Sequence, residues 1–250
     1  MSTLTAEVLS LLVPDRPEDR GILLVVVFGS AARSDTSPHD LDVVYITSGE
    51  PDASLTEAIR AARSRFVAAC GTRVDTFVMT ARTLWEKLAR GDVQVVSLFR
   101  HIRVVYDRGM ASWISSLIQT GVIRSDPSQT PRLREYALRC LSEAKNAQSH
   151  PAHRLGALRT AARSAIQCVL LSHGVEPAQP RGLVAQLSEL RPAPPGLEPC
   201  VSTAERFEKR LSELVRDPAS VRHADVDEWL DTVSSLVIEM LKLTGEQTLP

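Results

Sequence analysis

The stretch that most constrains this chain is an apolar run that ends in a tight turn and is followed by two acidic residues. Residues 22–28 are apolar and rich in β-branched side chains, which predicts a buried strand. Gly29 and Ser30 follow directly: glycine permits a tight turn, serine can cap a short helix, and exposed backbone amides suit an anion. Asp40 and Asp42 then open a second apolar run. Because alternate residues of a strand face the same side, we expect their carboxylates to project together.

Two neighbouring carboxylates beside an anion-binding turn predict a site for a metal-bound phosphate. Mg²⁺ takes oxygen ligands and commonly shares them with substrate phosphates. We therefore expect Asp40 and Asp42 to hold one or two Mg²⁺ ions, and Gly29 and Ser30 to bind the phosphates of a nucleoside triphosphate. Arg33, in the first turn after the glycine and serine, is a further candidate for a phosphate contact.

The Gly-Ser turn, the nine-residue spacer and the Asp-x-Asp strand resemble the signature of the polymerase-β-type nucleotidyltransferase superfamily. Within it, the chain is most similar to the minimal nucleotidyltransferases and the kanamycin nucleotidyltransferase. That family carries a third carboxylate on a neighbouring strand, which Asp75 within residues 73–78 matches. The resemblance covers roughly residues 20–108. Minimal members often have glycine where Ser34 stands and serine where His39 stands.

The resemblance implies an enzyme that moves a nucleoside monophosphate from a nucleoside triphosphate, with ATP favoured, to a hydroxyl group and releases pyrophosphate. Asp40 and Asp42 would be metal ligands. Asp75 would either complete the second metal site or take the proton from the acceptor hydroxyl. In the antibiotic-modifying relatives the base comes from the helical half, so Glu135 and Glu143 are reserve candidates for that role.

Strands and helices alternate up to residue 108. A short helix is expected within residues 3–13, and strands are expected at the two runs described above, around Asp75 and at 103–106. Capping boxes at Ser54-Leu55-Thr56-Glu57 and Thr83-Leu84-Trp85-Glu86 are expected to start two helices. Gly71 is expected to end the first of them. The resemblance accordingly implies an α/β (α+β) nucleotidyltransferase domain with a small mixed sheet.

Beyond residue 108 no strand pattern is found. Five helices are expected near residues 110–121, 131–148, 155–172, 198–216 and 225–243. The last is the clearest, since its apolar residues keep a three-four spacing along one stripe. Long amphipathic helices with short joints predict a helical bundle. We therefore expect a nucleotidyltransferase domain in residues 1–108 and a helical, substrate-binding domain in residues 109–250, as in the two-domain relatives.

Composition restricts the partners of the chain. Hydrophobic residues make up 44% and charged residues 24%, a profile typical of soluble globular proteins, and the net charge of −1 offers no global attraction to nucleic acid. A local excess of positive charge lies in residues 130–168, which carry seven basic residues: Arg132, Arg134, Arg139, Lys145, Arg154, Arg159 and Arg163. No apolar run reaches the ~18 residues of a membrane span, and the N-terminus does not look like a signal peptide, so a cytoplasmic protein is expected. The four widely spaced cysteines are expected to be free thiols.

Three functional hypotheses remain open from the sequence. The favoured one is nucleotidyl transfer to a small molecule, such as an aminoglycoside or a biosynthetic metabolite, because a substrate domain in the same chain suits a small acceptor. The second is modification of a protein or tRNA, as in toxin–antitoxin pairs, which the local basic stretch supports. The third is a non-catalytic nucleotide-binding module. A homodimer is retained as an assembly hypothesis.

Overall fold

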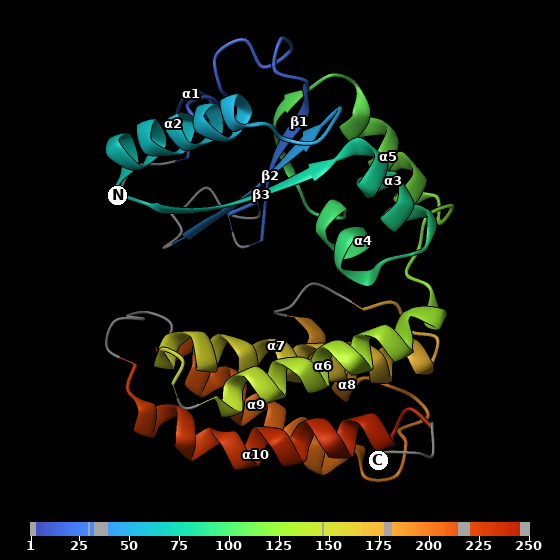
Figure 1. Cartoon of the computed structure of the whole chain (residues 1–250). Helices are drawn as coiled ribbons and strands as arrows, with labels where there is room; N and C mark the ends of the chain where they lie inside the picture. Colours follow the sequence, from blue (N-terminus) through green and yellow to red (C-terminus); the bar gives the residue numbers. More distant parts are fainter. Residues whose placement is uncertain are drawn as a thin grey trace. The chain divides into compact units, whose positions relative to one another are not determined.

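The chain forms two compact units, Met1–Ser125 and Asp126–Pro250 (Figure 1). This computed structural model describes residues 4–29, 31–32, 40–146, 148–177, 182–214 and 221–245. The first unit combines a sheet with helices, and the described part of the second is helical. The expected fold class, an α/β unit followed by a helical one, is confirmed.

The first unit is built on a four-stranded mixed sheet with the strand order β3-β2-β1-β4. Its strands are β1 (Ile22–Phe28), β2 (Asp40–Thr47), β3 (Arg73–Thr80) and β4 (Arg103–Asp107). β1 runs antiparallel to both of its neighbours, whereas β2 and β3 are parallel. A parallel pair needs a long crossover, which helix α2 (Ala53–Cys70) supplies. As a result, the end of β1 lies beside the start of β2, which lies beside the start of β3.

Helices cover both faces of this sheet. Alternation along β2 sends Leu41, Val43 and Tyr45 to one face and Val44 and Ile46 to the other. The first face packs against α1 (Ala6–Ser10) and α2, and the second against α3 (Ala81–Ala89), α4 (Val93–Phe99) and α5 (Met110–Gln119). Figure 1 shows α2 and the group α3, α4 and α5 on opposite sides of the strands.

Helix α5 belongs to the first unit, which moves the expected domain boundary. Its residues Ala111, Ile114 and Ile118 are buried in the same cluster as Leu24 and Val26 of β1. The boundary therefore falls after Ser125 and not after residue 108. The physical reason is that this amphipathic helix completes the cover of the sheet, which periodicity in the sequence does not reveal.

Two helices begin earlier than their predicted capping boxes. Asp52 caps α2, because its Oδ1 accepts a hydrogen bond from the amide of Leu55 at 2.7 Å. Thr80 caps α3 in the same way, through the amide of Thr83 at 3.1 Å. The predictions at Ser54 and Thr83 were wrong because an equally good capping side chain stands a few residues before each of them. Gly71 ends α2 in a left-handed conformation, as expected.

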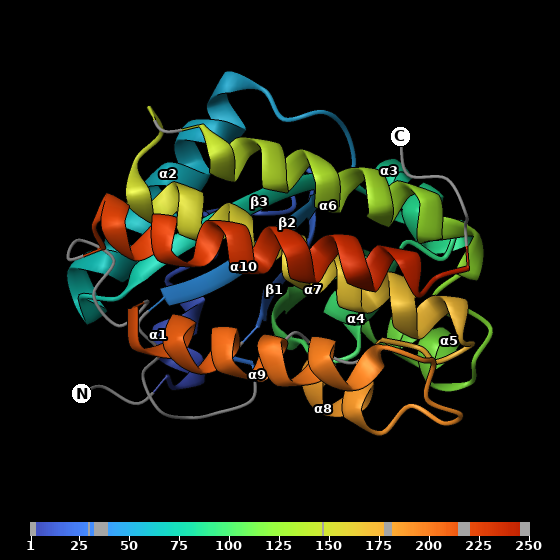
Figure 2. The same ribbon diagram turned by 90° about the horizontal axis from the view of Figure 1, so that it is seen from below.

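The second unit is a bundle whose central helix is α7. Its helices are a short 3₁₀ turn η1 (Pro127–Gln129), α6 (Thr130–Lys145), α7 (Pro151–Ser172), α8 (Leu183–Ser188), α9 (Leu197–Leu214) and α10 (His223–Lys242). α7 contacts α6, α8, α9 and α10, and Figure 2 shows α10 between α6 and α9. The expected helices are confirmed, whereas the short α8 was not predicted. Past Asp107, the described residues form no strand.

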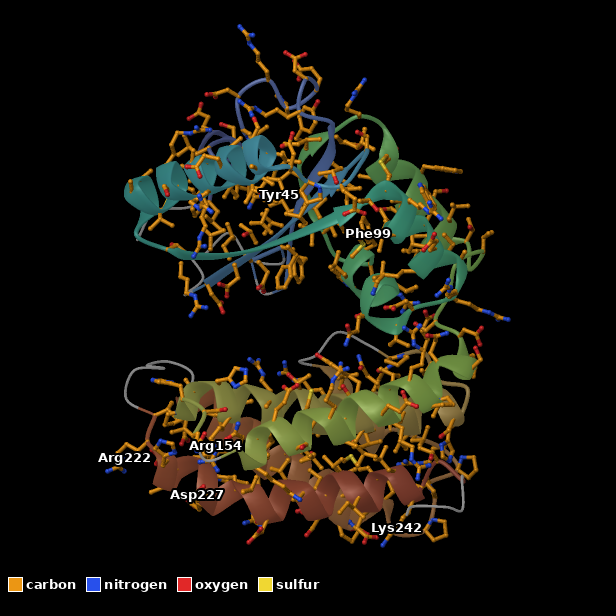
Figure 3. All side chains as sticks on the ribbon, viewed as in Figure 1. Tyr45, Phe99, Arg154, Arg222, Asp227 and Lys242 are labelled. Carbon is orange, nitrogen blue, oxygen red and sulfur yellow. The ribbon has the colours of Figure 1, made fainter. Side chains whose placement is uncertain are left out.

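A buried arginine on α7 forms hydrogen bonds to both α6 and α10. Arg154, at the start of α7, is 2% exposed. Its Nε donates to the carbonyl of Ala144 near the end of α6 at 2.8 Å, and its Nη2 donates to Oδ1 of Asp227 on α10 at 2.7 Å. Nη1 lies 3.1 Å from Nδ1 of His223. Figure 3 shows Arg154 and Asp227 side by side in the bundle. A cation at a helix C-terminus and a carboxylate near a helix N-terminus also complement the helix dipoles.

The four cysteines are free thiols, as expected. Across the described residues, no helix is both long and apolar enough to cross a membrane.

Candidate functional site

The predicted acidic residues gather at one end and on one face of the sheet. Asp42 is the register partner of Phe28 on β1 and of Asp75 on β3, and Asp40 is the partner of Arg73. Residues paired across neighbouring strands face the same side, and so do residues two apart on one strand. The carboxylates of Asp40, Asp42 and Asp75 therefore share the face that carries α3, α4 and α5 further along the strands.

Gly29 follows β1 and meets Asp42 directly. Its φ of +72° lies in the left-handed region, where side chains are disfavoured. A Cβ placed on Gly29 would also lie 2.8 Å from Oδ2 of Asp42, which is closer than such atoms can approach. The left-handed φ thus favours glycine here, and any larger residue would also have to displace the carboxylate of Asp42 from the space of the missing side chain.

Asp75 has a cationic partner on its own strand. Its Oδ1 accepts hydrogen bonds from Nε of Arg73 at 3.2 Å and from Nη2 at 3.1 Å. The side chains of Arg73 and Asp75 are 67% and 36% exposed, so this is a solvent-accessible ion pair of small energetic worth. The sequence interpretation missed Arg73, although a basic residue two positions before Asp75 on a strand must share its face.

The donors at this end of the sheet fit a hard metal ion. Carboxylate oxygens are ligands that Mg²⁺ prefers, and the ion is usually held by one or two carboxylates together with substrate phosphates. Asp40 is exposed and Asp42 half-buried, so both are placed to offer oxygens at the surface of the sheet end. Among the described residues, no group of three or more His, Cys, Asp or Glu side chains is arranged to hold a metal ion, so Asp40, Asp42 and Asp75 share a face without forming a ready three-carboxylate site.

Two other predicted phosphate contacts, Ser30 and Arg33, lie outside the described residues, as do Ser34 and His39. Their predicted roles stay predictions.

Two phenylalanines border the carboxylates on the same face. Phe28 is opposite Asp42, and Phe77 stands two residues after Asp75. Their ring centroids are 5.8 Å apart with planes inclined by 56°. Phe77 is 52% exposed. Sequence reasoning missed both rings, although the alternation along residues 73–78 could have placed Phe77 beside the acidic residue.

Some of the basic side chains in residues 130–168 form ion pairs inside the second unit. Arg163 binds Glu208 of α9 through Nε–Oε1 and Nη2–Oε2 contacts of 2.8 and 3.1 Å. Arg154 is buried in the contacts described above. Exposed basic side chains remain on α6, namely Arg132, Arg139 and Lys145. The reserve bases Glu135 and Glu143 are exposed on the same helix.

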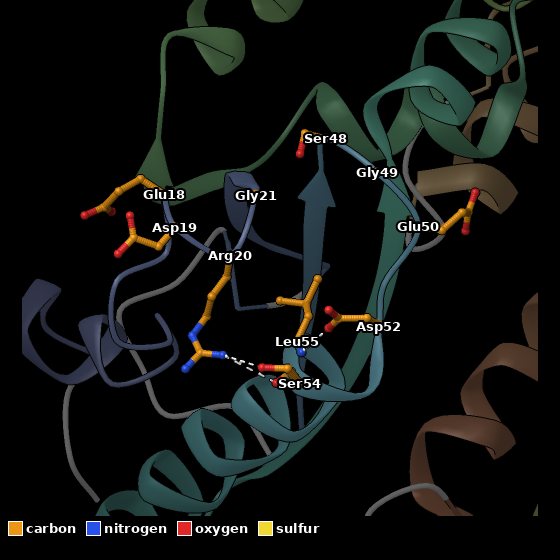
Figure 4. A pocket seen from close by; sticks show the side chains of 10 residues that line it. All are labelled: Glu18, Asp19, Arg20, Gly21, Ser48, Gly49, Glu50, Asp52, Ser54 and Leu55. Atoms are coloured by element: carbon orange, nitrogen blue, oxygen red, sulfur yellow. Dashed lines mark hydrogen bonds between the residues drawn. The ribbon is translucent and has the colours of Figure 1, made fainter.

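A polar pocket of about 430 Å³ lies at the other end of the sheet (Figure 4). It is formed where Gly21 precedes β1 and Ser48 follows β2, and the first turn of α2 closes it. Two of its charged groups are engaged locally: Arg20 donates to Oγ of Ser54 at 3.2 Å, and Asp52 caps α2. The pocket is therefore separate from the acidic end of the sheet, and its polar groups stabilise the entry into β1 and α2.

Comparisons with known proteins give limited likenesses. No family model matches the sequence, and no curated protein matches it significantly. One similar solved structure is described as a toxin-antitoxin with AMP-PNP; it shares 12% identity and a TM-score of 0.31, over 48% of this chain and 87% of that one. Another is a nucleotidyltransferase-like protein from Exiguobacterium sibiricum, with 9% identity and a TM-score of 0.35 over 95% of this chain and 75% of that one. At such TM-scores neither likeness establishes a shared family.

Proposed function

We propose that this chain is a metal-dependent nucleotidyltransferase that moves a nucleoside monophosphate from a nucleoside triphosphate to a hydroxyl group of a small molecule. The observation that carries the proposal is the contact between the glycine turn at Gly29 and the carboxylate of Asp42. Asp40 and Asp75 stand at the same end and on the same face of the sheet. A backbone turn beside carboxylates offers groups for both a phosphate and the metal that accompanies it.

Each residue has a defined part in this proposal. Asp40 and Asp42 would hold Mg²⁺, and the turn at Gly29, whose missing side chain makes room for Asp42, would present backbone amides to a phosphate. A metal ion held by these carboxylates would supply charge neutralisation for the phosphates during attack on the α-phosphorus. Asp75 either completes the ligand set or accepts the proton of the acceptor hydroxyl, and Arg73 orients its carboxylate. Ser30 and Arg33 are proposed as further phosphate contacts.

Nucleotidyl transfer needs no reactant besides the nucleoside triphosphate and the acceptor, because every bond that forms is matched by one that breaks. The acceptor oxygen forms a bond to the α-phosphorus while the bond from that phosphorus to the oxygen shared with the β-phosphate breaks. Pyrophosphate leaves with the electron pair, and the hydroxyl proton passes to the base. That base is Asp75 or, in the alternative assignment, Glu135 or Glu143. ATP is the proposed donor.

A small acceptor, such as an aminoglycoside or a biosynthetic metabolite, fits a chain that carries its own helical unit as a substrate-binding domain. The alternative acceptor is a tRNA or a protein. Exposed Arg132, Arg139 and Lys145 on α6 favour that alternative. The ion pairs of Arg154 and Arg163 weaken it, because these cations are already used inside the bundle.

The test follows label from ATP to acceptors in the presence of Mg²⁺. Aminoglycosides, a small-metabolite extract, bulk tRNA and cell protein are each incubated with ATP labelled in the α-phosphate or in the γ-phosphate. We expect α-label, and not γ-label, on one acceptor class, with transfer lost on addition of EDTA. Asp40→Asn and Asp42→Asn should each lower the rate about a thousandfold, because the charge that holds the metal is lost.

The matched control is Glu50→Gln, which removes an exposed carboxylate beyond the opposite end of β2 and should transfer label at the wild-type rate. Normal transfer by either aspartate variant, with its fold intact by circular dichroism, would refute the mechanism. Mg²⁺-dependent binding of ATP with no transfer to any acceptor class would instead support the non-catalytic alternative.

A further inference from the structure

The two phenylalanines beside the carboxylates form a continuous apolar surface. On this face the rows across β3, β2 and β1 read Asp75, Asp42, Phe28 and then Phe77, Val44, Val26. Alternate residues on a strand are about 7 Å apart, so Phe77 lies one row from the acidic row. The rings meet diagonally across β2, with centroids 5.8 Å apart.

Phe77 stands at the border between covered and open sheet. The next residue on its face, Met79, packs against the core under α3 and α5. Phe77 itself is 52% exposed, although burying a phenylalanine is normally favourable. Phe28, by contrast, is partly buried, packs against the core and contacts the neighbouring ring from one side. Phe77 therefore keeps exposed aromatic surface next to the carboxylates.

We propose that Phe28 and Phe77 form the stacking platform for the nucleobase of the triphosphate. This inference rests on the proposed function and deepens it. Along the exposed face of β3 the side chains change from charged, at Arg73 and Asp75, to aromatic at Phe77 and then to buried. A nucleoside triphosphate changes in the same order, from phosphates that need a metal to a planar ring that needs an apolar surface. Phe77 touches the base, and Phe28 positions the ring of Phe77.

Stacking gives affinity that does not depend on which base is present, because every base offers a π-face. Stacking contacts only the base, so its loss should leave the binding of the phosphates and of the metal unchanged. A ligand that keeps the phosphates and lacks the base therefore separates the platform from the metal site.

The experiment measures the binding of ATP and of inorganic tripolyphosphate, each with Mg²⁺, by calorimetry on the full chain. Three variants are compared with the wild type: Phe77→Ala, Phe77→Trp and Val78→Ala. Val78 is the matched control, since it is an exposed apolar residue of the same strand and points to the opposite face. We expect Phe77→Ala to weaken ATP binding about tenfold, as base stacking on an aromatic ring predicts. Tripolyphosphate binding should be unchanged, and Phe77→Trp and Val78→Ala should bind both ligands as the wild type does.

The outcomes separate this inference from the proposed function. If the wild type binds both ligands and Phe77→Ala binds them equally well, the stacking platform is refuted, whereas the proposed function is not. An equal loss for ATP and tripolyphosphate also overturns it, because the ring would then support the metal site and not the base. Failure of the wild type to bind either ligand with Mg²⁺ overturns both. If Phe77→Ala converts a dimer into a monomer by light scattering, the ring serves a second copy of the chain, and the platform is refuted.

Discussion

Gly29 and Asp42 illustrate how single residues specify this site. The absence of a side chain at Gly29 is favoured twice, by its positive φ and by Oδ2 of Asp42, which would lie 2.8 Å from an added Cβ. Gly21 likewise combines a positive φ with a close oxygen, Oγ of Ser48 at 2.6 Å from an added Cβ, whereas Gly71 meets only the first condition. Gly71, at the end of α2, has a φ of +68° with nothing within 4 Å of an added Cβ.

We therefore predict different outcomes for alanine at Gly29 and at Gly71. Gly29→Ala and Gly71→Ala should each lose about 1 kcal/mol of unfolding free energy, because both force a side chain into the left-handed region. Only Gly29→Ala should also displace the carboxylate of Asp42 and weaken Mg²⁺-dependent nucleotide binding by at least about tenfold. Urea unfolding and nucleotide titration of both variants measure the two effects. Equal nucleotide affinity in the two variants would contradict a role for this contact in the site.

For single residues, the sequence predicted which side chains share a face of the sheet, but it did not predict their hydrogen-bond and ion-pair partners. The period of two along β2 places Asp40 and Asp42 together without knowledge of the structure, whereas Asp75 is added because of the resemblance to a known family. The pairing of Asp75 with Arg73, and the burial of Arg154 against Asp227, depend on side-chain geometry and on helix packing. The contact of Arg154 with Asp227 brings together residues on separate helices, which local patterns do not encode.

At the scale of elements, a tyrosine joins the chain after α1 to the central part of the sheet. The hydroxyl of Tyr45 on β2 donates to the carbonyl of Leu12 at 2.7 Å, and the side chain is fully buried (Figure 3). Burial raises the pKa of this phenol well above its ordinary value, while Arg65 acts weakly in the other direction. The neutral hydroxyl is therefore the form that the folded protein requires.

We predict that Tyr45→Phe lowers the unfolding free energy by about 1–3 kcal/mol near neutral pH, because the buried carbonyl of Leu12 loses its donor. The variant should also be less sensitive to alkali. A raised pKa stabilises the folded state fully below the unfolded pKa of about 10, and this contribution is lost as the pH rises above that value. The wild type should lose up to about 1.4 kcal/mol per pH unit more than the variant in this range. Urea unfolding between neutral and strongly alkaline pH measures the slopes.

Tyr106→Phe on β4 is the matched control for loss of a phenol from the same sheet. Parallel alkaline slopes in the wild type and Tyr45→Phe would show that this hydroxyl does not control the alkaline stability.

The helix starts show why element boundaries are harder to predict than element types. Capping boxes at Ser54 and Thr83 satisfy the sequence pattern, yet the structure uses Asp52 and Thr80. Several nearby side chains can accept the same amide hydrogen bonds, and the choice depends on where the preceding strand or loop delivers the chain. The strands were predicted more closely, because Ile22–Phe28 is bounded by residues that cannot extend it.

At the scale of the whole molecule, α5 decides where the first unit ends. Without it, Leu24 and Val26 of β1 would lose part of their cover on one face. Each large apolar side chain left exposed costs about 1.5–3 kcal/mol relative to its buried state. We predict that a fragment of residues 1–125 unfolds cooperatively on heating, whereas a fragment of residues 1–108 is markedly less stable. Thermal unfolding followed by far-ultraviolet circular dichroism compares the two. A fragment of residues 1–108 as stable as the longer one would mean that α5 adds nothing to the unit.

The pairing of β1 with β4 makes formation of the first unit depend on residues far apart in the sequence. Val27 near the end of β1 pairs with Arg103 at the start of β4, so most of the first unit must be looped out before this ladder closes. In the second unit, by comparison, the most extensive packing joins α6 to α7, the next helix in the chain, although α10 also packs against α7. Folding rates fall as contacts become more distant in sequence. We therefore expect the amides of α6 and α7 to gain protection before those of β1 and β4, in pulsed hydrogen exchange during refolding. If the amides of both groups gained protection at the same time, α6 and α7 would form only together with the sheet, and the prediction would be wrong.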